Sequence, residues 1–129
     1  MRLALSALLA FMLASSVGCQ RSKPPVSASD VAAAEAQAQK EVSDARVEAT
    51  KAVRSAVKLA GSQSREVVIA KATGSFDIAM AKADGEHQVA LEKCLLLAAS
   101  ARQACKDEAD NAYQSAATTA KAIRASQQR

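Results

Sequence analysis

The spacing of apolar and polar residues predicts helices from about residue 30 to the end of the chain. Small or apolar residues recur every seven positions from Val31 onward, which is the spacing of one helix face. One column holds Val31, Ala38, Ala45, Ala52 and Leu59, and a second holds Glu35, Val42, Ala49 and Ala56. Ser29 is the expected N-cap, and Asp30 complements the helix dipole in the first turn. The pattern predicts a first helix over residues 30–60 with a seam made mostly of alanine.

The clearest interior break begins at Gly61, because glycine suits a helix C-cap and the following Ser64 suits the next N-cap. A second helix is expected from Ser64 to about Leu97. Its apolar column runs through Ile69, Phe76, Met80, Ala83, Ala90 and Cys94. Gly74 and Gly85 lie inside this helix, and each costs about 1 kcal/mol relative to alanine. We therefore expect a kink or a break at one of these glycines.

A third helix is expected over residues 103–126, after a turn for which Ser100 is the only turn-favouring residue. The one β-favouring run, EVVIA at residues 66–70, is short and has helix formers on both sides, so no strand is predicted. The expected fold class is all-α. The predicted architecture is an elongated helical hairpin or a small bundle of two to three alanine-rich helices.

Composition limits the core that such a chain can build. Half of the 129 residues are hydrophobic, but there is no Trp, one Tyr and two Phe, and alanine is abundant. An aromatic side chain buries about 150–250 Å², whereas alanine buries little. We expect one domain whose helices touch along narrow seams, and the composition argues against a pocket lined by large apolar groups.

The first residues have the pattern of an export signal. Arg2 precedes the apolar run LALSALLAFMLA, whose 12 residues fit a signal h-region and fall short of the ~20 that span a bilayer. The run leads into SSVGC, which ends at Cys19. This stretch resembles the lipobox of bacterial lipoproteins, although Ser16 stands where that family usually has Leu. The resemblance implies that residues 1–18 are a signal peptide, cleaved before an acylated Cys19.

The lipobox resemblance also implies a location. Two or more acyl chains would anchor the chain stably, and Gln20, in place of Asp, favours the outer membrane under enterobacterial sorting rules. Residues 19–29 contain two prolines and three serines and are predicted to form a flexible tether. Two alternatives remain open: an ordinary secreted protein cut near Ala14, and an uncleaved anchor.

The charged residues indicate a solvated helix surface. Lys and Arg number 17 against 13 Asp and Glu, and the signs alternate, as in KEVSDARVEATKAVR. Clustered basic residues of a nucleic-acid site are missing from this pattern. The sequence shows no nucleophile with a base at a meaningful spacing and no glycine-rich phosphate loop, so neither an enzyme nor a cofactor is expected. DEAD at residues 107–110 is expected to be a charged helix face. His87 lies seven residues before Cys94, but two ligands do not make a metal site.

Cys94 and Cys105 are predicted to form a disulfide, because an exported chain meets an oxidising compartment. In one unbroken helix their Cα atoms would lie about 16 Å apart, beyond the ~7 Å limit for a bridge. An intrachain bond therefore needs a turn between them. A continuous helix would instead place both thiols on one face, where they could cross-link two chains. The spacing alone permits both arrangements.

ALEKC at residues 90–94 and CKDEA at residues 105–109 resemble a group of small, exported, alanine-rich bacterial proteins of unknown function. Those proteins carry A-x-E-K-C and C-x-x-E-A segments on either side of a turn. The resemblance favours the intrachain bond. Two thiols of one chain also meet at high effective concentration, and leucines 95–97 are expected to fold over the bridge. Residues 64–129 are thus predicted to form a kinked helix followed by a disulfide-closed hairpin.

The expected function is that of a membrane-anchored structural or interaction lipoprotein of the bacterial envelope, facing the periplasm. In size, lipobox and alanine-rich heptads the chain resembles murein lipoproteins. Those end in a lysine linked to peptidoglycan and this chain ends in Arg129, so contact with the wall would be non-covalent. The expected partners are the bilayer through Cys19, peptidoglycan or envelope proteins, and a second copy of the chain in a homo-oligomer. A soluble periplasmic binding or stress-accessory protein is the alternative.

Overall fold

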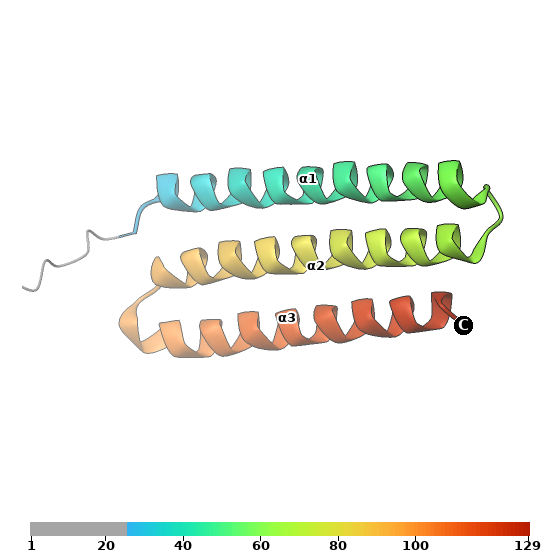
Figure 1. Ribbon diagram of the computed structural model, residues 1–129. Helices are drawn as coiled ribbons and strands as arrows, with labels where there is room; N and C mark the ends of the chain where they lie inside the picture. Colours follow the sequence, from blue (N-terminus) through green and yellow to red (C-terminus); the bar gives the residue numbers. More distant parts are fainter. Residues whose placement is uncertain (1–25) are drawn as a thin grey trace, which may run out of the picture.

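The computed structural model describes residues 26–129, which form three long antiparallel helices (Figure 1). They are α1 (Ala28–Ala60), α2 (Arg65–Leu95) and α3 (Ala99–Gln127). The described residues contain no strand, and the EVVIA run lies in the first turns of α2. The predicted all-α class and the small, elongated set of helices are confirmed.

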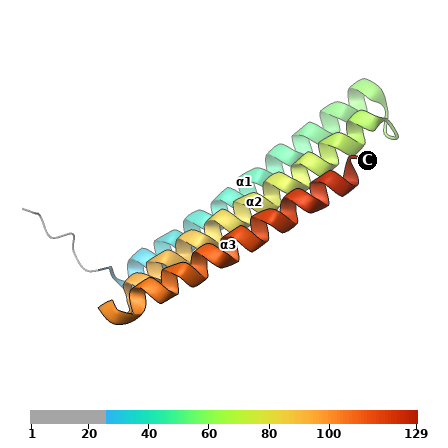
Figure 2. The same cartoon turned by 90° about the horizontal axis from the view of Figure 1, so that it is seen from below.

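The three helices form a single layer. Helix α2 packs against both neighbours, whereas no Cα atom of α1 comes within 8 Å of one in α3 across the described range. Figure 2 shows the same arrangement from below, with α1 behind α2 and α3 in front. Helix α1 begins beside the turn between α2 and α3, and the C-terminus lies beside the turn between α1 and α2 (Figure 1). At 1.5 Å per residue, the 33 residues of α1 make the layer about 50 Å long.

The first helix begins earlier than predicted. Its N-cap is Ser27, not Ser29, and the Ser27 backbone N–H donates to the Asp30 carboxylate at 2.7 Å. Asp30 thus stands three residues after the cap, where the reciprocal bond of a capping box is made. The prediction of Ser29 was wrong because that residue sits inside the first turn, one position before Asp30. The segment before the helix therefore ends at Ser27, two residues earlier than the predicted tether.

The turn between α1 and α2 agrees with the sequence prediction. Gly61 is the C-cap with φ +84°, a left-handed conformation that suits glycine, and its N–H donates to the carbonyl of Val57 at 3.0 Å. The Ser64 hydroxyl then accepts from the backbone N–H of Val67 at 3.3 Å. Both caps satisfy backbone groups that a helix end leaves unpaired.

The second turn is shorter and lies earlier than predicted. Residues 96–98 join α2 to α3, so Ser100 falls within α3, which begins four residues before the predicted start. The Leu97 carbonyl accepts from Arg102 Nε at 2.9 Å. No glycine or proline marks this turn, and alanines at 98, 99 and 101 favour early helix.

The buried face of α1 repeats every eleven residues, not every seven. Apart from Glu41, its buried and half-buried helix positions are Val31, Ala34, Ala38, Val42, Ala45, Ala49, Val53 and Ala56. Their steps of three, four and four residues recur along the helix. The heptad prediction was wrong at Glu35 and Ala52, which are exposed, and at Leu59, which is 86% exposed. A strict heptad column drifts about 20° per repeat around a straight helix, so it leaves the contact face within a few turns.

The same period governs the other two helices. In α2, the column Ala72, Ala83 and Cys94 is buried, while the column Lys71, Lys82 and Lys93 is exposed. In α3, Ala109 and Ala120 are buried eleven residues apart. Eleven residues in three turns give about 3.67 residues per turn, close to the 3.6 of a straight α-helix. This period suits helices that lie side by side with little supercoil.

Helix α2 is continuous from Arg65 to Leu95, so the predicted break at Gly74 or Gly85 was wrong, and Figure 1 shows no kink along this helix. Both glycines are buried against α1. A Cβ added to Gly74 would lie 2.6 Å from the Ala49 Cβ, and one added to Gly85 would lie 2.6 Å from the Ala38 Cβ. The missing side chains let the two backbones approach closely, and this contact offsets the low helix propensity of glycine.

The core is thin, as the composition predicts. Among the described residues, the buried hydrophobic side chains are Val31, Val67, Ala72, Ala83, Cys94, Ala109, Ala117 and Ala120. Of the predicted α2 column, Ala83 and Cys94 are buried, whereas Ile69 is 41% exposed. Within the described range, no helix combines the length and apolar character needed to cross a membrane.

Candidate functional site

The end of the layer near the α2–α3 turn brings the two predicted cysteines together. Cys94 comes from the last turn of α2 and Cys105 from the second turn of α3, and their Cα atoms are 5.6 Å apart. This separation lies within the range of natural disulfides, so the two cysteines form a disulfide-compatible pair. The turn that an intrachain bond requires is present. Cys94 is fully buried, and Cys105 is half-buried.

The leucines after Cys94 do not cover the pair as predicted. Leu96 is 49% exposed and Leu97 is 43% exposed, and only Leu95 is half-buried. Leu96 and Leu97 belong to the turn, where the backbone direction changes and carries both side chains outward.

A polar cluster joins α2 to α3 in the middle of the layer. His87 Nε2 lies 2.6 Å from Asp110 Oδ1, and the His87 ring stacks on Tyr113 with centroids 5.0 Å apart. The cluster explains where His87 lies: it is a half-buried seam residue whose polar partner is on the neighbouring helix. Asp110 belongs to the DEAD run, which lies on α3 as a largely exposed face.

The side chains of His87 and Cys94 face different partners. The sulfur of Cys94 faces Cys105, and the imidazole faces Asp110. Within the described range, no group of three or more His, Cys, Asp or Glu side chains is arranged to hold a metal ion. The small groove beside the cluster has a volume of about 80 Å³ and is lined largely by alanines. Sites for small organic ligands measure about 300–1,000 Å³, so the cluster fits an interhelical clasp.

Asp84 completes this cluster from α2. Its carboxylate accepts a hydrogen bond from the Tyr113 hydroxyl, and this bond raises the pKa of Tyr113 above its ordinary value of 10.0. The negative charge of Asp84 and partial burial act in the same direction. Because the folded state raises this pKa, the contribution to stability is present below pH 10 and is lost as pH rises through the folded-state pKa.

Asp84→Ala should therefore lower the midpoint of the Tyr113 titration toward its ordinary value. The chain has one Tyr and no Trp, so the phenolate absorbance reports this residue alone. Asp77→Ala removes an exposed carboxylate from the same helix and is the matched control. An Asp84→Ala midpoint equal to that of the wild type would contradict the assigned partner.

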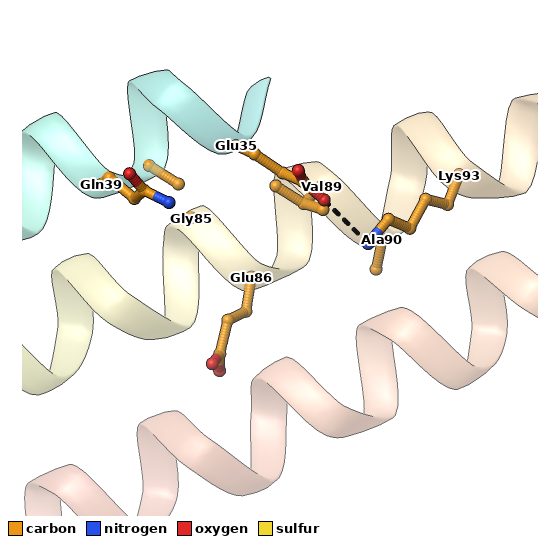
Figure 3. Close-up of a pocket in the computed structure, with 8 residues that line it drawn as sticks. Glu35, Gln39, Gly85, Glu86, Val89, Ala90 and Lys93 are labelled. Atoms are coloured by element: carbon orange, nitrogen blue, oxygen red, sulfur yellow. Dashed lines mark ion pairs between the residues drawn. The ribbon is translucent and has the colours of Figure 1, made fainter. Parts of the chain in front are cut away.

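The groove in Figure 3 lies between α1 and α2, on the side of the layer where Lys93 reaches Glu35 at 3.0 Å. Its volume is about 360 Å³, and Gly85 contributes to its lining. Both charged groups are about half exposed, so the pair contributes roughly 0–1 kcal/mol. Figure 3 shows the Glu86 side chain directed away from α1. The groove is open, and its charged side chains are mostly held in ion pairs.

The far half of the α2–α3 seam is held by a different contact. The Arg124 guanidinium lies over the Phe76 ring, 4.9 Å from its centroid. Such cation–π contacts contribute about 0.5–1 kcal/mol at exposed sites. Together with the His87 cluster, this contact ties α3 to α2 beyond the cysteine pair.

The sequence contained one signal that heptad counting missed. Valines at 31, 42 and 53, lysines at 71, 82 and 93, and glycines at 74 and 85 are all spaced by eleven. An eleven-residue reading would have placed the glycines on one face of α2 and the lysines on another. The polar cluster had no such signal, because His87 and Asp110 are separated by 23 residues and meet only through the turn.

The predicted lipidation residue Cys19, the signal peptide over residues 1–18 and most of the tether lie outside the described residues. Comparison of this chain with protein-family models, curated proteins and solved structures finds no match.

Proposed function

We propose that this chain is a membrane-anchored structural or interaction lipoprotein of the bacterial cell envelope. An acylated Cys19 holds it in the outer membrane with the helices in the periplasm, and it acts by contact and not by catalysis. The observation that carries the proposal is the apolar run that leads through SSVGC to Cys19. The resemblance of that stretch to a lipobox supports cleavage before residue 19.

The shape of the helical layer suits an anchor at this end. The chain enters α1 at the end of the layer that holds the cysteine pair, and the Gly61 turn lies at the opposite end (Figure 1). A lipid on Cys19 would therefore hold the layer by one end, with its far end about 50 Å away. The tether of residues 19–27 spans at most about 30 Å. The layer would present its long faces to non-covalent partners such as peptidoglycan or envelope proteins.

Exposed faces, more than a pocket, are what the helices offer. A groove of about 590 Å³ is open between α1 and α2 and has small residues at its base. Binding of a small apolar ligand would call for large apolar walls. This geometry supports the interaction role over the alternative of a soluble small-molecule binding protein.

Cys19→Ala should prevent lipidation and leave residues 1–18 attached, because acylation of the cysteine thiol precedes cleavage in lipoprotein maturation. Intact-mass measurement of the membrane fraction should find an acylated chain starting at Cys19 in the wild type and an unmodified precursor in the variant. Ser16→Leu is the control, since it supplies the residue usual at this lipobox position and should retain processing. A wild-type chain that is unlipidated and free in the periplasm would contradict the proposal and favour the soluble alternative.

A further inference from the structure

The α1–α2 seam carries grooves of opposite charge on its two sides. Ala49 and Gly74 line both grooves, so the two grooves share one seam contact. Ser75 lines one groove and Thr73 the other. Each of these residues is rotated about 100° from Gly74, in opposite directions, so the grooves open on opposite faces of the layer. Their volumes are about 590 and 510 Å³.

The basic groove is bordered by Arg46, Arg54 and Lys71, and all three are exposed. None of the three makes an ion pair with another described residue. Elsewhere on this face the lysines are paired: Lys82 with Glu86 at 3.7 Å and Lys93 with Glu35 at 3.0 Å. The unpaired positive charge is thus confined to the half of the face nearer the Gly61 turn.

The acidic groove is bordered by Glu48, Glu66 and Asp77, which are also exposed. Lys51 pairs with Glu48 at 2.6 Å, while Glu66 and Asp77 make no ion pair within the described part of the chain. The half-exposed Ile69 adds apolar surface at this groove. At the same level of the seam, one face of the layer is therefore basic and the other acidic.

We propose that the chain stacks on further copies of itself, with the acidic groove of one copy placed on the basic groove of the next. When a copy is translated perpendicular to the layer, the three carboxylates of its acidic groove come to lie opposite the three cations of the neighbouring basic groove. A twofold pairing of identical faces would instead place like charges together. The interface is heterologous, and its repetition builds an open row of layers.

Two further observations support a second copy as the occupant. Helical domains usually bury their apolar surface between packed layers, whereas both faces of the α1–α2 pair are open here. A strip two helices wide and about 50 Å long offers on the order of 1,000 Å² per face, above the ~800 Å² per partner of a stable interface. Translation also keeps every N-terminal end on the same side of the row. The stack does not depend on the proposed anchor.

The test uses two charge-reversed forms of the full chain. The basic-groove variant carries Arg46→Glu, Arg54→Glu and Lys71→Glu, and the acidic-groove variant carries Glu48→Lys, Glu66→Lys and Asp77→Lys. Two differently tagged copies are co-purified in a non-ionic detergent, and sedimentation gives the size of the complex. We expect wild-type copies to associate and each variant alone to associate at least about tenfold more weakly, because both of its faces then carry one sign.

A mixture of the two variants should restore the complex, since each face again meets its opposite. Two copies that only shared a detergent micelle would co-purify whatever the sign of these charges. The control is Lys40→Glu, Lys121→Glu and Arg129→Glu, which changes the net charge as much as the basic-groove variant but borders neither groove. It should associate like the wild type, and circular dichroism verifies that all variants are helical.

Three results would overturn the stack. The first is a wild-type chain that stays monomeric at low salt, and the second is a variant mixture that does not reassociate although both variants are folded. The third is a wild-type monomer whose basic groove binds vesicles containing anionic lipid, with binding lost in the basic-groove variant. That outcome would assign the groove to an anionic surface instead of a second copy.

Discussion

Gly74→Ala should destabilise the protein, although alanine is the better helix former. On an exposed helix the substitution would stabilise by about 1 kcal/mol. Here the new Cβ would lie 2.6 Å from the Ala49 Cβ, so α1 and α2 must move apart. Overpacking of this kind costs about 1–3 kcal/mol, and adding Gly85→Ala against Ala38 places a second clash on the same seam. Denaturant unfolding of the double variant should give a clearly lower free energy of unfolding than the wild type.

Exchange of the two residues provides the decisive control. Gly74→Ala combined with Ala49→Gly keeps one glycine and one alanine in the seam, so helix propensity cancels. Most of the lost stability should return; the remainder reflects the Ala49 Cα, which would still lie 3.2 Å from the new Cβ. Ser75→Ala changes the exposed neighbour and should be neutral or slightly stabilising. A Gly74→Ala variant more stable than the wild type would show that the seam does not close as described.

Removal of the cysteine pair should lower the free energy of unfolding by about 2–3 kcal/mol, the contribution of a bridge that closes a loop of this length. The change is Cys94→Ala with Cys105→Ala, which leaves neither member of the pair to cross-link wrongly. The loss of stability should appear first in α3, because α3 packs only against α2 within the described part of the chain. Hydrogen exchange followed by mass spectrometry should show faster exchange in α3 than in α1.

Treatment with a reductant is the matching experiment. It should loosen α3 in the wild type and leave the double variant unchanged. Non-reducing electrophoresis of the wild type should show a monomer, since the turn at residues 96–98 brings the two cysteines of one chain together. A reducible dimer that the double variant does not form would mean that Cys94 and Cys105 bridge two chains in the cell.

Sequence predicted best the features that depend on neighbouring residues. The C-cap at Gly61 and the N-cap at Ser64 occur as expected, because both rest on bonds within four residues. The start of α1 was misplaced by two residues for a similar reason: Ser27 and Ser29 both precede helix formers, and only the bond to Asp30 distinguishes them. The turn after Leu95 carries no glycine or proline, so the local sequence could not place it.

Other features could be interpreted only once the neighbouring helix was in place. Gly74 lowers the stability of an isolated helix, whereas in the folded chain it lets Ala49 of α1 approach closely. Leu59 continues a heptad column in the sequence but is exposed, because the face of α1 that meets α2 follows an eleven-residue period instead. The clasp between His87 and Asp110 joins residues 23 positions apart. Spacing along one helix carries no information about such a partner.

By itself, the sequence determined that the described chain is helical, where the first turn lies and that its core is thin. Helix propensity, caps and side-chain size are properties of short segments, and they act before any packing occurs. Only the tertiary structure decided which faces meet, that α2 runs straight through its glycines, and that Lys71 and Asp77 lie on opposite sides of one seam. These features depend on how α1 and α2 are paired, and close packing of the two backbones sets that pairing.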